Sequence, residues 1–351
     1  MIENALYIEE LKTVTDAPIP WNKLDGAKVL ITGANGLIAS FLVDCLIHRN
    51  ETRGSNISVF ALCRNKEKAE KRFKGCRKNQ NFHLVVQNVC EPLNLNINFD
   101  YIVHAASNAH PLAFSAEPVE TIEANVLGSM NLLEYAKKHD VRRFLFVSSG
   151  EIYGQNNSDR HNPLIETDCG HIDPTDPRAS YPESKRLSET LCAAYQKEYG
   201  VSTVIARPCH IYGPTMSVDN FRADAQFIRK ALKKEDIILK SAGTQLRSYC
   251  YVADAVRAML YILLLGESGE AYNIANKNCT VTIRAFAETL AKIAGVRVVF
   301  ENPDDVEKAG YSKVNNAVLN AAKLERLGWK AQVDLENGLT KTVNILSDKD
   351  R

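Results

Sequence analysis

A glycine-rich turn after a short apolar run constrains the fold of this chain more than any other feature. The run, residues 28–32, has the composition of a buried strand, and the residues after the turn follow helical spacing. Gly33 permits a tight turn, Gly36 lets the backbone approach a ligand, and Ala39 is small enough to pack helix against strand. Amide groups at such a helix N-terminus bind a pyrophosphate. We therefore expect a bound dinucleotide, with contacts from Gly33, Asn35, Gly36, Leu37 and Ile38.

Strand-like and helical segments alternate through the first two-thirds of the chain. Further buried strands are predicted at residues 57–63, 83–86, 101–105 and 143–148, and a long helix at 118–139. This alternation predicts an α/β fold with a Rossmann-type, doubly wound parallel sheet and helices on both of its faces. After residue 200 the pattern loosens, which predicts a smaller, discontinuous α+β lobe that binds the substrate.

The predicted domain boundaries lie where these patterns change. Residues 1–25 precede the first strand, and we expect them to form an N-terminal extension on the surface. The Rossmann domain is predicted over residues 26–207, with 245–278 returning to it. The substrate-binding lobe would then comprise residues 208–244 and 279–351.

Composition and charge exclude several classes of protein. The formal net charge of +1 gives no reason to expect nucleic acid as a partner. The nine cysteines form no C-x-x-C pair, which fits a reducing compartment, and neither they nor the histidines have metal-ligand spacing. Residues 1–21 do not resemble a signal peptide, and the apolar stretch 258–265 is too short to span a membrane. We therefore expect a cytoplasmic enzyme without a metal and without a membrane partner.

The end of the second predicted strand leaves the choice of dinucleotide open. An acidic residue there would bind the adenosine ribose, but the chain has Arg64 and Asn65. Arg64 could pair with the 2′-phosphate of NADP; alternatively it borders the adenine, and NAD binds through Asn65 and the backbone. The ends of the third and fourth strands supply further expected cofactor contacts, namely Asn88, Val89, Ala105, Ala106 and Ser107.

Tyr181 and Lys185 lie four residues apart, so a helix places both side chains on one face. The pKa of a free tyrosine is about 10, and a neighbouring lysine together with a positive nicotinamide ring would favour the phenolate. Lys185 could also hold the cofactor ribose. Ser149 and Glu151 follow the predicted strand at 143–148, at the sheet edge where doubly wound folds bind ligands. We expect these four residues to be catalytic.

In this order, the motifs resemble the extended short-chain dehydrogenases/reductases of the NAD-dependent epimerase/dehydratase family, which modify nucleotide sugars. The likeness runs from Val29 to about Val343 and includes the segments 206–214 and 247–254. It implies NAD or NADP as cofactor, a nucleotide sugar as substrate, and a homodimer formed through the helices around 118–139 and Tyr181. It also implies cofactor contacts from Asn125, Pro208 and His210. The implied substrate contacts are Ser149, Gly150, His210, Gln226 and Arg247.

Within that family the chain is most similar to UDP-glucuronate decarboxylases. In the shared opening step Tyr181 would take the proton of the sugar C4 hydroxyl as a hydride leaves, which gives a 4-keto sugar. Glu151 and Arg247 match the decarboxylases, and Gly150 replaces the aspartate of similar dehydratases. Phe114, Gly150 and His210 depart from the decarboxylase pattern, so C4 epimerisation stays open as an alternative. A 4,6-dehydratase or an NADPH-dependent keto-sugar reductase fits less well.

Overall fold

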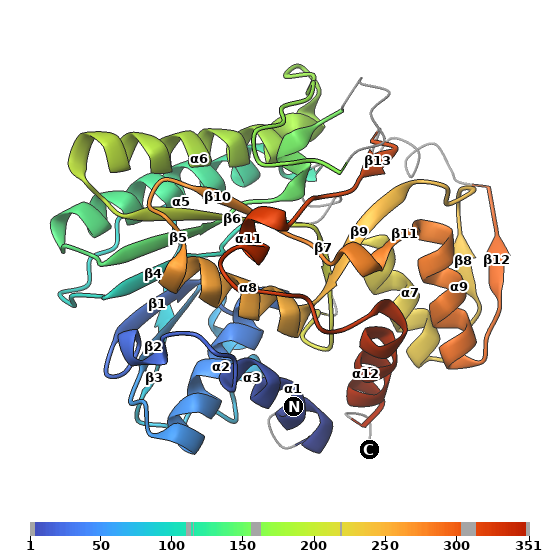
Figure 1. The fold of residues 1–351 in the computed structure, drawn as a ribbon, viewed down its shortest axis with the longest axis horizontal. Coiled ribbons are helices and arrows are strands. Elements are labelled where there is room, and N and C mark those ends of the chain that lie inside the picture. The colour runs from blue at the N-terminus through green and yellow to red at the C-terminus, as the bar shows by residue number, and fades with distance from the viewer. Residues whose placement is uncertain are drawn as a thin grey trace.

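Seven parallel strands form the main sheet of the molecule (Figure 1). The structure, a computed structural model, describes residues 4–109, 114, 116–155, 163–217, 220–302 and 314–348. The strands are β1 (Lys28–Thr32), β2 (Ser58–Cys63), β3 (Phe82–Val86), β4 (Tyr101–His104), β5 (Arg143–Val147), β6 (Thr203–Pro208) and β10 (Ala271–Ile274). Their order in the sheet is β10-β6-β5-β4-β1-β2-β3. The chain order reverses between β1 and β4, so the ligand crevice of such a sheet lies at the carboxyl ends of these two strands. The predicted Rossmann-type sheet is confirmed.

Helices cover both faces of this sheet (Figure 1). On one face lie α2 (Leu37–Arg53) and α8 (Val252–Leu265), and on the other lie α5 (Pro118–Lys138) and α6 (Ser180–Tyr199). Successive side chains of β1 point to opposite faces, as in any strand. Val29 and Ile31 accordingly belong to the core that contains α2 and α8, whereas Leu30 belongs to the core that contains α5 and α6. The strands are apolar throughout because both of their faces are covered.

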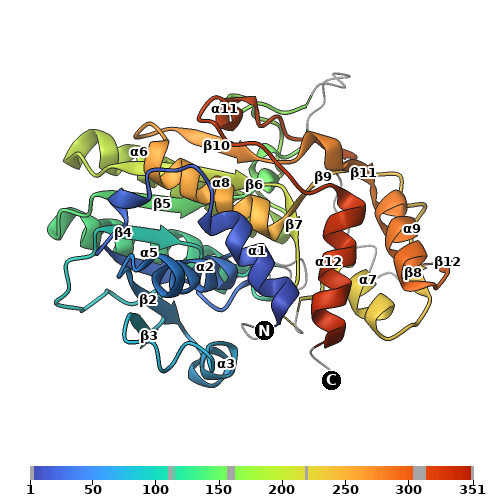
Figure 2. The same ribbon diagram turned by 60° about the horizontal axis from the view of Figure 1, so that its bottom comes forward.

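The smaller lobe, on the right of Figures 1 and 2, is built from segments that lie apart in the sequence. Its four-stranded mixed sheet comprises β7 (His210–Tyr212), β9 (Leu246–Tyr251), β11 (Thr280–Thr282) and β13 (Asn316–Ala317). A second sheet pairs β8 (Ile237–Leu239) with β12 (Val298–Phe300). The helices of this lobe are α7 (Ala223–Leu232), α9 (Ile283–Ala294) and α12 (Leu335–Ser347). Between β9 and β11 the chain returns to the main sheet through α8 and β10, where α11 (Ala322–Glu325) also packs.

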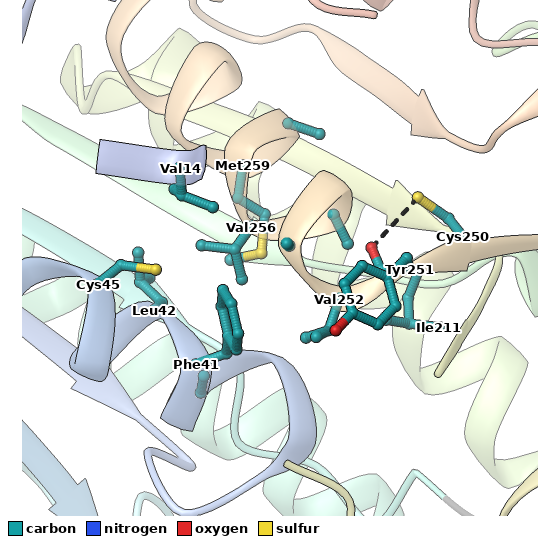
Figure 3. Packing of buried hydrophobic residues seen from close by; sticks show 14 of the residues in the cluster. Val14, Phe41, Leu42, Cys45, Ile211, Cys250, Tyr251, Val252, Val256 and Met259 are labelled. Atoms are coloured by element: carbon teal, nitrogen blue, oxygen red, sulfur yellow. Dashed lines mark hydrogen bonds between the residues drawn. The ribbon is translucent and has the colours of Figure 1, made fainter. Parts of the chain in front are cut away.

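The N-terminal extension lies at the surface with one side only, and the other side of its helix is buried, which we did not expect. Its helix α1 (Ala5–Thr15) packs against α2 and α8 and buries Tyr7, Leu11 and Val14. Figure 3 shows Val14 among side chains of α2 and α8. Tyr7, Leu11 and Val14 recur at i, i+4 and i+7, which is the spacing of one buried helix face. The helix is therefore part of the main core.

Some chemical classes of site are not found in the part of the chain that the structure describes. All nine cysteines are free thiols. Within the described ranges, no three His, Cys, Asp or Glu side chains converge in a way that could hold a metal ion. Among the same residues, no helix combines the length and the apolar character needed to cross a membrane.

Candidate active site

The glycine turn after β1 is tied to the end of β4 by a close backbone contact. Gly33 has a φ of +60°, and a Cβ atom there would lie 2.6 Å from Ala106 Cα and 2.9 Å from the Ala105 carbonyl oxygen. Glycine alone suits both the left-handed conformation and this close approach. Gly36 then precedes α2, and among the described residues no side chain caps that helix N-terminus. The first amide groups of α2 are therefore suited to bind an anionic group.

A buried Thr32–His104 pair holds the two strand ends behind this turn. Thr32 Oγ1 accepts a hydrogen bond from the Ala106 amide at 3.2 Å and lies 2.8 Å from His104 Nδ1. Burial, with a smaller contribution from Lys185, lowers the pKa of His104 to about 3. The imidazole is therefore neutral, and its Nδ1 can accept the Thr32 hydroxyl proton. This pair was missed from the sequence, where its signal is a polar residue at the end of each of two apolar strands.

The segments that follow β2 and β4, on either side of β1, lie where the adenosine half of a dinucleotide would bind. Arg64 is exposed and donates to Asn108 Oδ1 at 3.3 Å, which links the two strand ends. Asn65 Oδ1 accepts a hydrogen bond from the Lys68 amide at 2.9 Å and so caps α3 (Lys66–Arg72). The Asn65 oxygen is therefore engaged in the fold, and Arg64 remains an exposed cation at this edge.

Three buried side-chain oxygens that follow β4 and β5 or lie on α5 have no hydrogen-bond partner within the described chain: Ser107 Oγ, Ser148 Oγ and Asn125 Oδ1. The Asn125 amide group donates to Ser184 Oγ at 2.8 Å, so Asn125 links α5 to α6 while its oxygen stays unsatisfied. Buried polar atoms are nearly always hydrogen-bonded in native proteins, which makes these atoms fit a polar ligand. The Gly33 cradle and these oxygens together suit a bound NAD.

Two further predicted cofactor contacts follow β3. Asn88 is exposed, and its Oδ1 accepts a hydrogen bond from the Cys90 amide at 3.1 Å. Val89 is buried, and its carbonyl oxygen accepts a hydrogen bond from Asn131 of α5 at 3.0 Å. The loop after β3 is thus held against α5, beside the ends of β2 and β4.

Tyr181 and Lys185 lie on the first turns of α6, against the end of β5. Both are buried, with 6% and 2% of their surface exposed. Lys185 Nζ donates to the Val147 carbonyl oxygen at 2.7 Å and lies 5.9 Å from the centroid of the Tyr181 ring. Ser149, which precedes the short helix η2 (Gly150–Tyr153), forms a hydrogen bond with the Tyr181 side chain. The structure therefore brings Ser149, Tyr181 and Lys185 together.

The phenol of Tyr181 is not activated by the protein groups alone. Burial raises the pKa of Tyr181 to about 12, although the hydrogen bond from Ser149 opposes this shift. Burial also lowers the pKa of Lys185 to about 7, while Glu189 opposes that change. The expected lowering of the tyrosine pKa by Lys185 is not seen, and the Lys185 amine donates to the Val147 carbonyl oxygen. A positive nicotinamide ring would have to supply the remaining stabilisation of the phenolate.

Glu151 of η2 lies near charged side chains from two other elements. Its carboxylate is 3.8 Å from Arg178 Nη2, on η3 (Pro177–Ala179). Arg247 of β9 is 4% exposed and donates to the carbonyl oxygens of Leu246 and Val314 at 2.9 and 2.7 Å. Burial lowers the pKa of Arg247. The charge of Arg178 lowers this pKa further, whereas the charge of Glu151 opposes the shift. Arg178 was missed from the sequence, although it stands three residues before Tyr181 and so lies one helical turn from it.

His210 lies at the start of β7, paired in register with Tyr249 of β9. Burial, Arg222 and Arg247 lower the pKa of His210 well below its ordinary value, so the imidazole is neutral. Arg222, which precedes α7, also lowers the pKa of Tyr181. Its Nη2 atom forms a salt bridge with Asp224 Oδ2 at 3.3 Å. Arg222 was likewise missed, because its approach to Tyr181 depends on how the two lobes meet.

Two of the predicted substrate contacts, Gln226 and Gly150, differ from the others in their environment. Gln226 is exposed on α7, and its amide donates to the Phe221 carbonyl oxygen at 2.7 Å. The structure does not bring it together with Tyr181. Gly150 is closely packed, since a Cβ atom there would lie 3.0 Å from Leu319 Cδ1 and 3.5 Å from the carbonyl oxygen of Pro208. A larger residue at position 150 would require Leu319 to move.

The sheet, the glycine cradle and the buried Tyr181–Lys185 pair are those of a Rossmann-type dinucleotide enzyme. The model of the NAD dependent epimerase/dehydratase family matches residues 29–275. This match covers more than half of the chain, and the chain belongs to that family as an NAD-dependent enzyme.

Relatives of known name are similar over most of the chain. UDP-glucuronic acid decarboxylase 6 of Arabidopsis thaliana is 33% identical over 316 residues, which cover 89% of this chain and 86% of the relative. UDP-glucuronic acid decarboxylase 1 of Xenopus tropicalis is 31% identical over 331 residues, which cover 91% of this chain and 72% of the relative.

Solved structures share the fold. A UDP-glucose 4-epimerase from Thermotoga maritima, solved with UDP-glucose, aligns with a TM-score of 0.79 and 26% identity over 92% of this chain and 100% of its own. A dTDP-glucose 4,6-dehydratase from Streptomyces venezuelae, solved with NAD, aligns with a TM-score of 0.78 and 25% identity over 92% of this chain and 97% of its own.

Proposed function

We propose that this enzyme decarboxylates UDP-glucuronate through a 4-keto intermediate. The observation that carries the proposal is Arg247, a buried cation near Glu151 that has no carboxylate within ion-pair distance among the described residues. A buried charge without a countercharge is costly even when backbone carbonyl oxygens accept its hydrogen bonds, so the site fits an anionic group of the substrate. The relatives named UDP-glucuronic acid decarboxylases support the same substrate.

In this proposal the side chains of the enzyme move the protons and orient the sugar. Bound NAD supplies the hydride acceptor and later the hydride donor. Tyr181 takes the proton of the C4 hydroxyl, while Ser149 donates a hydrogen bond to the same oxygen. The C4 ketone makes the C6 carboxylate part of a β-keto acid. The bond between C5 and C6 then breaks, carbon dioxide leaves, and the electron pair stays on C5.

Arg247 and Glu151 act at the next step of the proposed reaction. The enolate takes a proton at C5, and Arg247 is the proposed donor. Glu151 is proposed to orient that proton donor or a water molecule beside C5. As C4 is reduced again, Tyr181 returns its proton to the C4 oxygen. The product is a UDP-pentose, and the cofactor is oxidised at the start and at the end.

We also propose which part of NAD each predicted cofactor contact binds. We place the pyrophosphate on the turn from Gly33 to Ile38, and the ribose of the nicotinamide half on Lys185. Ala105, Ala106, Ser107 and Asn125 then border the middle of the cofactor, and Pro208 and His210 border the nicotinamide end. Their support is the cradle at Gly33 and the unsatisfied oxygens of Ser107 and Asn125.

Mass spectrometry of the purified enzyme incubated with NAD and UDP-glucuronate tests the reaction. We expect loss of one carbon dioxide from the sugar and no net accumulation of NADH. UDP-glucose and UDP-galactose serve as parallel substrates that lack the carboxylate. A product of unchanged mass and altered chromatographic retention would identify a C4 epimerase instead. That second candidate is favoured by the backbone hydrogen bonds of Arg247, which would leave C5 without a proton donor if they persist.

Substitution of Tyr181 by Phe tests the assignment of the base. The variant keeps the ring but loses the hydroxyl, so we expect turnover to fall by about 100-fold or more, the range for loss of a general base. NAD binding, measured by fluorescence titration, should be retained. Turnover at the wild-type level in Tyr181→Phe would show that the mechanism is wrong.

We also propose that the enzyme is a homodimer that associates through α5 and α6. The two helices lie side by side on one face of the sheet (Figure 1). Large apolar side chains on them are exposed, namely Val119, Ile122, Leu127, Met130 and Leu187. Leu132 and Leu133, in contrast, are buried in the core. Sedimentation analysis would decide between monomer and dimer.

The division into domains and the compartment are proposals as well. We propose a cofactor domain over residues 26–207 with a returning segment 252–278, and a substrate-binding lobe from 208–251 and 279–351. The pairing of β10 with β6 supports the return. Because β9 pairs within the sheet of the smaller lobe, the return begins with α8 and not at residue 245, as expected from the sequence. The free cysteines support a reducing compartment, for which we propose the cytoplasm.

A further inference from the structure

The ring of Phe114 is in contact with the proposed base. Phe114 is 3% exposed, and its ring stacks on the Tyr181 ring with centroids 5.1 Å apart and an interplanar angle of 18°. Stacked aromatic pairs at this distance contribute beyond the area that they bury and prefer particular orientations. The contact therefore restricts how the Tyr181 ring can turn about its side-chain bonds.

Phe114 also contacts the short segment of chain that carries the proposed base, Tyr181. Ser180 Oγ donates to the Phe114 carbonyl oxygen at 3.3 Å, and the Arg178 guanidinium lies over the Phe114 ring at 5.5 Å from its centroid. Three of the four residues from Arg178 to Tyr181 thus contact Phe114. Arg178 also reaches Glu151 at 3.8 Å. One ring is therefore the packing link between the proposed base and the Arg178–Glu151 pair.

We propose that Phe114 is a positioning residue, which holds the Tyr181 phenol in the orientation for proton transfer and keeps water from it. The inference rests on the proposed role of Tyr181 as base. Phe114 itself exchanges no proton in the reaction. Its effect passes through the ring contact, because a base misplaced by a fraction of a bond length loses much of its rate advantage.

The groups around the Tyr181 hydroxyl determine how a substitution of Phe114 would change the pKa of Tyr181. Ser149 at the start of η2 and Arg222 before α7 lower the pKa of the phenol, and Glu151 of η2 raises it. Lys185 lies one turn further along α6. Burial is the largest influence on the phenol, and it raises the pKa. Removing the Phe114 ring would admit water and lower that pKa, while the charged groups stay in place.

The test compares Phe114→Leu with Phe114→Tyr in steady-state kinetics across pH. For Phe114→Leu we expect kcat to fall about tenfold, with KM changed by less than about threefold, as for a residue that acts only in the transition state. The ascending limb of the kcat profile should move to lower pH. Phe114→Tyr keeps the ring and should restore both kcat and the position of the limb. A role limited to packing would lower stability and leave the pH limb where it is.

Phe300→Leu is the matched control. Phe300 carries a similar guanidinium contact, from Arg284 at 5.1 Å, but it lies on β12 of the smaller lobe. Its substitution should change neither kcat nor the pH limb. If Phe114→Leu does not fold, Phe114→Met carries the same test with an unbranched side chain.

The outcomes separate this inference from the proposed function. A Phe114→Leu enzyme with wild-type kcat and an unmoved pH limb would overturn the positioning role while Tyr181→Phe remains inactive. Full activity of Tyr181→Phe would instead overturn the assignment of the base, and the role of Phe114 with it.

Discussion

At the scale of single residues, Gly33 is where backbone geometry and cofactor binding meet. In Gly33→Ala a non-glycine residue would adopt a φ of +60°, which costs roughly 1–2 kcal/mol, and its Cβ would press on the Ala106 backbone. We expect a lower melting temperature and a loss of NAD affinity of at least about tenfold, measured by calorimetry and fluorescence titration.

Gly54 supplies a matched control for the conformational part of this effect. Gly54 ends α2 with a φ of +64°, and a Cβ atom there would meet nothing within 4 Å among the described residues. Gly54→Ala should therefore show the conformational cost and leave NAD affinity unchanged. Equal behaviour of the two variants would mean that the close approach to Ala106 is unimportant.

Also at the residue scale, we expect Arg64 to influence how tightly NADP binds relative to NAD. The guanidinium is exposed and bound to Asn108 by one long hydrogen bond, so it is available to a 2′-phosphate. We expect Arg64→Ala to weaken NADP binding by about tenfold, the loss of one charge-assisted hydrogen bond, and to leave NAD binding within about twofold. Competition titrations with both dinucleotides measure the ratio. An unchanged ratio would place Arg64 outside the cofactor contacts.

At the scale of elements, α1 is joined to the core by more than apolar packing. The Tyr7 hydroxyl donates to Asp44 Oδ2 of α2 at 2.5 Å, and Arg72 forms a salt bridge with the same carboxylate. Tyr7→Phe leaves Asp44 with one donor fewer in a buried setting, which costs about 1–3 kcal/mol of unfolding free energy. Urea denaturation measures this loss. The same substitution at the exposed Tyr199 should cost less than about 0.5 kcal/mol.

The smaller lobe is joined to the same helix. Lys341 of α12 donates to Glu10 of α1 at 2.7 Å, and Asn4 donates to Asp348 at 3.1 Å. Because Glu10 is buried, its pairing with Lys341 links α1 to the last helix of the chain. The extension thus contacts both parts of the molecule, which its sequence alone did not indicate.

At the scale of the whole molecule, His104 makes stability depend on pH. Its pKa in the folded state is about 3, against an ordinary value of 6.5, so between these values the unfolded chain binds a proton that the folded chain does not. The free energy of unfolding therefore falls as the pH drops from 6.5 towards 3. His104→Gln removes this group, so the loss of stability between pH 7 and pH 5 should shrink by about 2 kcal/mol.

Urea denaturation at the two pH values measures that difference. His83→Gln is the control, because His83 is exposed on β3. An equal pH dependence in wild type and His104→Gln would show that His104 takes up a proton in the folded state. His210, whose pKa is also lowered by burial, adds to the wild-type slope in both comparisons.

The sheet and the glycine turn were predictable because their signals are local. A strand such as β1 is recognised from five consecutive residues, and the turn at Gly33 and Gly36 from the next four. The spacing of Tyr181 and Lys185 places them on one face of a helix wherever that helix lies. Ser149 and Glu151 were indicated by their position directly after a predicted strand, whereas Arg247 was added by the family resemblance and carries no local signal of its own.

The sequence by itself therefore determined the order of strands and helices, the cradle for the cofactor and the Tyr181–Lys185 pair. The tertiary structure alone decided that one face of α1 is buried, that Thr32 contacts His104, and that Phe114 stacks on Tyr181. It also decided the state of the phenol, since the burial that raises the pKa of Tyr181 comes from residues of several elements. The physical reason is the same in each case: packing and desolvation depend on side chains far apart in the sequence, whereas turn geometry and helical spacing depend on neighbours.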